Sequence, residues 1–477
     1  MSVYQAASSW KDRFQLVLSS FLQSEGLPFS DVLSEERIEQ VLHPTLQADD
    51  KVADGDEKSV YTVAITLWAF LSQMLFKDEQ RSCRAAVSRV STLLVAQGHE
   101  GCSKNTGAYC RARAQLPTEG IRQLAMETAD NAEQKLPEEW LWLGRYVKIA
   151  DGFTVSMPDT VENQEEFPQA ATQKKGLGFP LARCVALFSL ATAMALDLEI
   201  GPYAGKETGE TALLRKMLAG LDSGDILLAD CYYCSYFMIA LLMALKVDCV
   251  FRAHQCRAVD FKSGKRLGKK DHTVSWTRPP QPKWMDDETY AKIPESIEVR
   301  EIEVRINKPG FRPTSLVIVT TLTDSDTYTA DDIADLFRKR WLVEQDIRAL
   351  KCNMGIDILR GKTPDMVRKE VYAAMLAYNL IHETMRQAAQ QAELKPRDLS
   401  FTHALQTIAS SWMLMPVSTP AIQAALIDNA LHGYTQQLVG RRPDRVEPRA
   451  VKRRPKPHDI MTEPRDEARA KLLHQNA

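Results

Sequence analysis

Three carboxylates in this chain lie where metal chemistry could be built. Asp151 and Asp230 each stand at the end of a short apolar run typical of a strand, and Glu344 lies in a helical segment. If these elements are neighbours, the three negative charges repel one another unless a hard cation lies among them. Oxygen ligands suit Mg²⁺ or Mn²⁺, and a pair of such ions can activate an attacking hydroxyl and stabilise the leaving oxygen of a phosphodiester.

Each carboxylate taken alone also has a simpler explanation. Asp151 followed by Gly152 is typical of a turn, and Glu344 with Arg348 could be an i,i+4 pair on a solvated helix face. Competing chemistries are poorly represented, because the chain has no glycine-rich phosphate loop and no nucleophile elbow. Hydrolysis at a metal site needs no serine or cysteine nucleophile.

The helical segment from Asp331 to Gly355 is the element that must position Glu344. It has an acidic first turn and no proline or glycine before Gly355, so we predict one continuous helix. At about 100° per residue, one arc of roughly 80° holds five side chains: Phe337, Arg340, Glu344, Arg348 and Lys351. An apolar stripe lies beside that arc: Leu336, Val343, Ile347, Leu350 and Met354. A helix docked by this stripe would hold Glu344 among three cations at the edge of a buried surface.

The remaining periodicity predicts an α/β protein. Strands are expected at 146–155, running into a turn at Asp151 and Gly152, and at 225–230 and 247–252. The segment 255–324 contains an alternating run at 297–306, typical of a half-exposed antiparallel strand. We therefore expect a β-rich insertion immediately before the Glu344 helix.

The first 140 residues are expected to be helical. A break at 97–101 separates one helical run from a second that carries Lys104, Arg111 and Arg113, which is compatible with a helix-turn-helix. An ordinary helical hairpin explains the same pattern equally well.

Composition places any nucleic-acid contact in local patches. The chain has 477 residues and a net charge of −2, so the molecule as a whole has no strong field for DNA. The segment 440–457 holds eight basic and two acidic residues, a net charge of +6, and suits either phosphate contact or a solvated tail. Nine cysteines without a signal peptide lead us to expect a cytoplasmic protein with reduced thiols and no membrane segment.

Three motifs in this order resemble those of a known family. They are the run from Asp151 to Asp159 (DGFTVSMPD), the Leu-Leu-Ala before Asp230, and Arg340-Trp-x-Val-Glu344 followed after six residues by Lys351. They resemble the DDE transposases of bacterial insertion sequences, in the insertion-sequence-four group with the signature Tyr-x-x-Arg-x-x-x-Glu-x6-Lys. One departure is Phe337, which stands where the signature has tyrosine.

The resemblance implies a ribonuclease-H-like mixed sheet flanked by helices, with a β-rich insertion and a helical N-terminal domain. We therefore predict an N-terminal DNA-binding domain at 1–140, a catalytic domain at 141–390 with its insertion at about 255–324, and a C-terminal helical region with the basic tail at 391–477. The expected metal-binding and catalytic triad is Asp151, Asp230 and Glu344, with two ions of Mg²⁺ or Mn²⁺.

Further side chains are expected at the DNA. By matching position, Arg340 and Lys351 would contact terminal phosphates, and Phe337 would stand in for the phosphate-contacting tyrosine. We hypothesise that Phe337 retains the ring packing beside Arg340 and the DNA end, and that Arg348, on the same helix stripe, supplies the missing donor. Trp276 or Trp284 would stack where a base has flipped out, although either could instead be a buried anchor of the insertion.

The predicted function is that of a cut-and-paste DNA transposase, with hydrolysis at the element ends and strand transfer to target DNA. The partners would be double-stranded DNA, namely terminal inverted repeats and target, bound by a homodimer across paired ends near the nucleoid. Two rivals remain: a ribonuclease-H-like nuclease that cuts without joining, and a non-catalytic DNA-binding regulator derived from a transposase.

Overall fold

The computed structural model describes residues 15–22, 34–42, 60–306, 314–440 and 461–475. The basic segment 441–456 therefore lies outside the described residues. Within those residues, no helix has the length and apolar character needed to cross a membrane.

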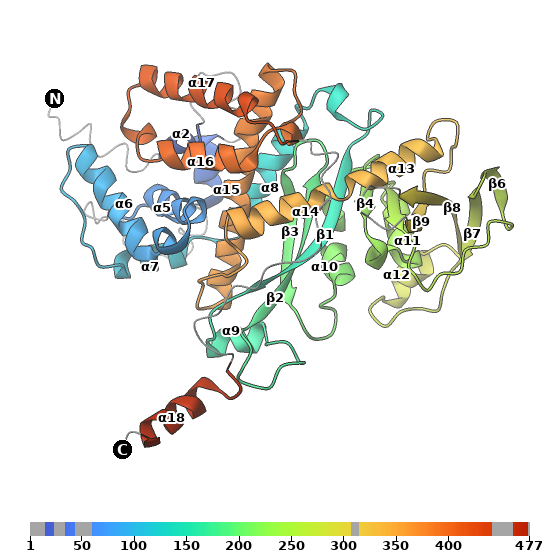
Figure 1. Cartoon of the computed structure of the whole chain (residues 1–477), viewed down its shortest axis with the longest axis horizontal. Coiled ribbons are helices and arrows are strands. Elements are labelled where there is room, and N and C mark those ends of the chain that lie inside the picture. The colour runs from blue at the N-terminus through green and yellow to red at the C-terminus, as the bar shows by residue number, and fades with distance from the viewer. Residues whose placement is uncertain (1–14, 23–33, 43–59, 307–313, 441–460, 476–477) are drawn as a thin grey trace.

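One sheet of nine strands runs through the molecule (Figure 1). Its order is β3-β2-β1-β4-β5-β9-β8-β7-β6, in which β1 is antiparallel to β2 and parallel to β4. The strands are β1 (Val147–Ser156), β2 (Leu181–Ser189), β3 (Ala195–Pro202), β4 (Ile226–Ala229), β5 (Asp248–Arg252), β6 (Lys265–Gly268), β7 (Asp271–Thr277), β8 (Ser296–Ile306) and β9 (Thr314–Thr320). The predicted α/β class, with a mixed sheet flanked by helices, is confirmed.

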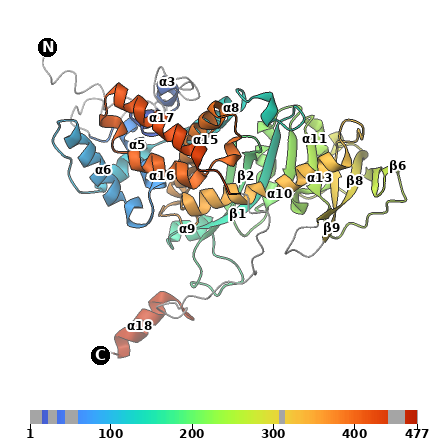
Figure 2. The same ribbon diagram turned by 45° about the horizontal axis from the view of Figure 1, so that its top comes forward.

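Helices pack on both faces of this sheet, and further helices lie beside it or, like α18 (Arg465–Gln475), away from it (Figure 2). In chain order, the helices of the N-terminal part are α2 (Gln15–Ser20), α3 (Glu35–Leu42), α5 (Val63–Leu75), α6 (Cys83–Ala96), α7 (Gly107–Gln115) and α8 (Thr118–Glu133). Between the strands lie α9 (Val161–Glu166), α10 (Glu210–Met217), α11 (Tyr236–Ala244) and α12 (Asp287–Lys292). After the sheet come α13 (Ala330–Lys339), α14 (Leu342–Arg348), α15 (Pro364–Gln391), α16 (Phe401–Ser411), α17 (Pro420–Gln436) and α18 (Arg465–Gln475).

The two faces of β1 and β4 belong to different hydrophobic cores, because successive side chains point to opposite faces of a strand. Ile149 and Leu228 lie in the core that also contains residues of α13, α14 and α15. Ala150 and Leu227 lie in the core that contains residues of α10 and α11. A residue's position along β1 or β4 therefore decides which set of helices it meets.

The β-rich segment before α13 extends the same sheet. Strand β9 returns to pair with β5, and β8, β7 and β6 continue outward from it, all antiparallel. The alternating run predicted at 297–306 is β8, which pairs on both sides and is buried at Arg300 and Glu301.

The predicted turn at Asp151 and Gly152 is wrong. Strand β1 continues through both residues to Ser156, and Gly152 is paired with Val185 of β2. Glycine inside a strand commonly marks a close approach by another group, and that is the case at Gly152, as described below.

The prediction of one continuous helix from 331 to 355 is also wrong. The helix ends at Lys339, restarts at Leu342 as α14, and closes in a π-helical turn over Ala349–Asn353. At the break, the amide of Trp341 bonds the carbonyl of Arg338, and that of Val343 bonds the carbonyl of Arg340, both over three residues. The predicted apolar stripe is nevertheless buried, with Leu336, Val343, Leu350 and Met354 inaccessible to solvent and Ile347 packed against the core.

Helix α15 connects the N-terminal and C-terminal helices to the sheet. It packs against α5, α8, α16, α17 and β3. Asn379 within it accepts from the amide of Ala195 at 2.9 Å and donates to the carbonyls of Ala195 and Ala125 at 2.8 Å. The N-terminal and C-terminal helices meet where the rings of Trp68 and Trp412 stack at 5.4 Å.

Backbone pairing also ties the segment after α14 to β1. The amide of Ser156 donates to the carbonyl of Asp357 at 3.0 Å, and the amide of Leu359 donates to the carbonyl of Ser156 at 2.8 Å. Helix α14 itself packs against β1. The helix that carries Glu344 is therefore anchored to the strand that carries Asp151.

Candidate active site

Strand register brings Asp151 and Asp230 together. On the parallel pair β1 and β4, Ile149 lies opposite Leu228. Two residues further along each strand stand Asp151 and Asp230, and Asp230 is the first residue beyond β4. Since hydrogen-bonded strands lie about 4.8 Å apart, the two carboxylates are neighbours at the point where β4 ends and β1 continues.

Arg340 connects Asp151 to the Glu344 helix. Its Nη1 lies 3.7 Å from Asp151 Oδ2 and its Nη2 lies 4.0 Å from Glu344 Oε1. The Arg340 side chain is only 9% exposed, whereas that of Glu344 is 54% exposed. Among the described residues, Nε of Arg340 is buried without a hydrogen-bond partner. Two of the three predicted triad carboxylates, Asp151 and Glu344, thus lie around one buried guanidinium whose Nε has no hydrogen-bond partner among the described residues.

The electrostatics of Asp151 reflect this crowding. Burial raises its pKa to about 6, opposed by the amide of Gly152 and by Arg340, and the charges of Glu210 and Asp230 raise it further. The Gly152 amide donates to Asp151 Oδ1 at 2.8 Å, and the amide of Cys231 donates to Asp230 Oδ1 at 2.6 Å. These backbone bonds fix how both carboxylates point.

Sequence reasoning missed two residues of this site, Glu210 and Tyr233. Glu210 begins α10, and the hydroxyl of Tyr233 donates to its Oε2 at 3.4 Å. A Cβ built on Gly152 would lie 2.4 Å from Cδ of Glu210. The signal that could have led to Glu210 was Gly152 itself, because an unexplained glycine inside a strand indicates that another group approaches.

The donor set fits a hard divalent cation, since every candidate ligand is a carboxylate oxygen. In this arrangement, no three His, Cys, Asp or Glu side chains of the described part of the chain are close enough to hold a metal ion. Arg340 lies between Asp151 and Glu344, where it offsets part of their negative charge. The Glu344 side chain is more than half exposed to solvent.

The other residues predicted at the DNA end differ in exposure. Phe337 is buried in the core at 3% exposure, Arg348 is exposed, and Lys351 is half-buried with its Nζ 5.9 Å from the ring centroid of Phe153. Trp341, which follows Arg340, is 53% exposed beside this group. Arg348 and, in part, Lys351 therefore reach solvent near Glu344, whereas the Phe337 ring does not.

Of the three N-terminal cations predicted to contact DNA, two are exposed to solvent and one is directed into the protein. Lys104 and Arg111 are exposed. Arg113 is directed inward, since its Nη1 donates to Gln73 Oε1 at 3.0 Å and its guanidinium lies 5.1 Å from the ring of Phe70. The connection between α6 and α7 spans 97–106, longer than the three or four residues of a helix-turn-helix, so the helical-hairpin alternative fits better.

Both candidate tryptophans are engaged within the protein. Trp276 is 4% exposed, donates from Nε1 to Glu301 at 3.0 Å, and lies under the guanidinium of Arg257 at 3.2 Å. The guanidinium of Arg215 lies 3.7 Å from the ring centroid of Trp284, which also packs edge-on against the buried Phe237. In this structure each serves as an anchor of the β-rich segment.

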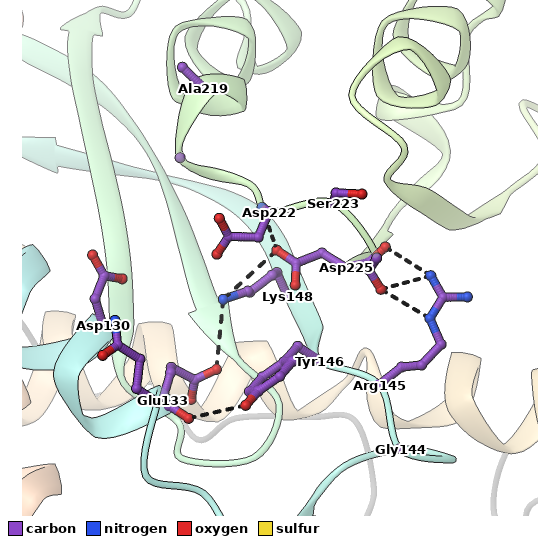
Figure 3. A pocket seen from close by; sticks show the side chains of 13 residues that line it. Asp130, Glu133, Gly144, Arg145, Tyr146, Lys148, Ala219, Asp222, Ser223 and Asp225 are labelled. Atoms are coloured by element: carbon purple, nitrogen blue, oxygen red, sulfur yellow. Dashed lines mark hydrogen bonds and ion pairs between the residues drawn. The ribbon is translucent and has the colours of Figure 1, made fainter.

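A separate cavity of about 710 Å³ lies toward the amino ends of β1 and β4, away from Asp151 and Asp230. Figure 3 shows Lys148 between Glu133 and Asp225, at 3.7 and 3.9 Å from their carboxylate oxygens. All three side chains are buried. Burial raises the pKa of Glu133 and of Asp225, and the positive charge of Lys148 opposes that rise in both.

This buried group predicts a pH-dependent stability effect. A carboxyl whose pKa is raised by folding favours the folded state at acidic pH, and that stability is lost as the pH rises through the folded pKa. Lys148→Met would raise both pKa values further, so it should cost about 3–5 kcal/mol at pH 8 and clearly less at pH 5. Urea unfolding at both pH values measures this, with the exposed Lys262→Met as control. Equal losses at the two pH values would contradict the role of Lys148.

Comparisons with known proteins agree on one family. A model described as the transposase DDE domain matches residues 142–380. Over 359 residues, the chain is 25% identical to the transposase InsG for insertion sequence element IS4 of Escherichia coli strain K12, covering 73% of this chain and 76% of that protein. It is 33% identical over 70 residues to the transposase for insertion sequence element IS421 of Escherichia coli, covering 15% of this chain and 19% of that protein.

Among solved structures, the chain is similar to the piggyBac transposase synaptic complex with hairpin DNA. The alignment covers 87% of this chain and 84% of that one, at a TM-score of 0.41 and 11% identity.

Proposed function

Because the chain belongs to the family of transposases with a DDE domain, and is thus an enzyme that acts on DNA, we propose that it moves a mobile element by cutting and joining. Asp151, Asp230 and Glu344 act as its metal-binding triad. The observation that supports this most directly is the register of the parallel strands β1 and β4, which places Asp151 and Asp230 each two residues beyond the Ile149–Leu228 pair, with Arg340 linking Asp151 to Glu344.

The three carboxylates would hold two ions of Mg²⁺ or Mn²⁺ through oxygen ligands alone. When bound, such ions supply activation of the attacking oxygen and stabilisation of the leaving oxygen of a phosphodiester. The amides of Gly152 and Cys231 orient the Asp151 and Asp230 carboxylates for this role. Asp151 would bind the metal ions in its deprotonated form. The positive charge of Arg340 favours that form, because it opposes the rise in the Asp151 pKa that burial causes.

The cations around Glu344 would hold the DNA end. Arg340 has a buried Nε without a partner among the described residues, which suits a phosphate oxygen arriving from outside. Arg348 is exposed and Lys351 half-buried on the same segment, so both can reach a backbone phosphate. These side chains position the terminal phosphodiester against the carboxylates. The DNA partners would be the terminal inverted repeats and a target duplex, bound by a homodimer.

The decisive experiment is an assay of cleavage and joining on a supercoiled donor plasmid that carries the element ends. A cut-and-paste transposase gives both excised element and strand-transfer product in Mg²⁺ or Mn²⁺. Cleavage without joining would make the protein a nuclease, and end binding without either product would make it a DNA-binding regulator.

Recognition of the element ends is proposed for the N-terminal helices, through the exposed cations Lys104 and Arg111. Arg111→Ala should weaken end binding and reduce the slope of log K against log salt by about one, the share of one phosphate contact. Binding at two salt concentrations measures both. The exposed Arg84→Ala on α6 is the control, and an Arg111→Ala protein that binds ends like the parent would remove α7 from the DNA interface.

A further inference from the structure

The approach of Glu210 to Gly152 is the least expected feature around Asp151. Gly152 is paired inside β1 and needs no positive φ, so no turn requires it. Glycine is needed because there is no space for a side chain at this position. A Cβ there would lie 2.4 Å from Cδ and 2.7 Å from Oε1 of Glu210. The missing side chain leaves a gap in the strand, and the Glu210 carboxylate of α10 enters it beside Asp151.

This carboxylate belongs to the same electrostatic group as the strand carboxylates. The charge of Glu210 contributes to the raised pKa of Asp151, together with that of Asp230. Tyr233 is fully buried, and its pKa is raised first by burial and then by Glu210, Asp151 and Asp230. The Tyr233 hydroxyl thus lies near three carboxylates and donates to one of them, Glu210.

The stability of α10 alone does not explain where the Glu210 side chain lies. An acidic residue at the first position of α10 would interact favourably with the helix dipole wherever its side chain pointed. Glu210 instead enters the space at Gly152, near enough to Asp151 for its charge to raise the Asp151 pKa. Within the described residues it forms no ion pair, unlike Glu207, which pairs with Arg215. Like charges brought together in a partly buried place cost free energy unless a cation joins them.

The buried cation of the site does not reach Glu210. Arg340 forms its two ion pairs with Asp151 and Glu344, and its side chain is more than nine-tenths buried with Nε still unpartnered among the described residues. Among the described residues, Nε of Arg340 thus has no acceptor, and no cation pairs with both Asp151 and Glu210.

We propose that Glu210 is a fourth acidic ligand of the divalent metal held at Asp151, admitted to the site by the absence of a side chain at Gly152. This proposal rests on the proposed function, because it places Glu210 at the same metal site. The Tyr233 hydroxyl holds one oxygen of Glu210 and leaves the other free for the ion. Asp151 and Glu210 then approach the ion from opposite faces of β1.

The test is Mn²⁺ binding by the full chain without DNA, followed by the electron paramagnetic resonance signal of free Mn²⁺. Glu210→Gln should weaken binding at least about tenfold, and Gly152→Ala should weaken it similarly, because the added Cβ displaces the flexible Glu210 side chain. Glu210→Ala removes the obstacle, so adding Gly152→Ala to it should cause no further loss, a non-additive cycle. The exposed Glu207→Gln should bind like the parent.

Asp151→Asn separates this proposal from the proposed function. If Asp151→Asn loses Mn²⁺ binding while Glu210→Gln and Gly152→Ala bind like the parent, Glu210 is no ligand and the triad stands. If Asp151→Asn also binds like the parent, the metal site itself is misplaced and both proposals fall. Thermal unfolding in EDTA should show every variant folded, since none removes buried apolar volume.

Discussion

Replacing Asp151, Asp230 or Glu344 by alanine should lower both cleavage and joining of the element ends at least about a thousandfold. The stabilisation that metal ions give to a phosphodiester transition state is several kcal/mol, and each 1.36 kcal/mol is a factor of about ten in rate. End binding should persist, because the cations at the DNA interface remain. The measurement is cleavage of a supercoiled donor. A variant that retains more than a few per cent of parental cleavage would show that the substituted residue does not belong to the triad.

The same substitutions should not unfold the protein, which makes the loss interpretable. Burial raises the pKa of Asp151, so its ionised form is less stable in the folded chain than in the unfolded one. Asp151→Ala should therefore leave the melting temperature in EDTA unchanged or higher. The exposed Asp335→Ala on α13, which removes only a surface pair with Arg338, is the matched control and should retain activity. A large fall in melting temperature for Asp151→Ala would indicate a structural role instead.

The strands that carry the site were predictable because their apolar runs are short and sharply bounded. The run before Asp230 is β4, and the run at 247–252 is β5, as the sequence predicts. Register was not predictable, since nothing local specifies that Ile149 lies opposite Leu228. Only that long-range pairing makes Asp151 and Asp230 neighbours.

The two local errors have tertiary causes. Asp-Gly is a common turn pair, but at Asp151 the glycine serves the close approach of Glu210, a residue about sixty positions away in the chain. The helix was expected to be continuous because no proline or glycine interrupts the segment before Gly355. The structure breaks it there and directs Arg340 toward Asp151. Local patterns could reveal neither event, because each depends on a partner that is distant in sequence.

Phe337→Tyr should change end processing by less than about twofold, whereas Phe337→Ala should impair it. The Phe337 ring is 3% exposed and lies in the core beneath α13. Removing a buried phenyl ring costs about 3–5 kcal/mol, so the alanine variant should also melt at a clearly lower temperature. Phe337→Leu keeps most of the volume and should recover most of both properties. This ordering would mean that ring packing, which supports the neighbouring Arg340, is what the position supplies.

The hydroxyl that Phe337 lacks would then be replaced by another donor, and Arg348 is the best placed candidate. It is exposed on α14, one turn beyond Glu344, on the segment that also carries Lys351. A hydrogen bond to a charged phosphate contributes about 1.5–3 kcal/mol, so Arg348→Ala should weaken binding of element ends roughly tenfold or more. Arg338→Ala, exposed on α13 and paired with Asp335, should bind like the parent. A large gain in activity from Phe337→Tyr would show instead that the hydroxyl was needed, and that Arg348 does not replace it.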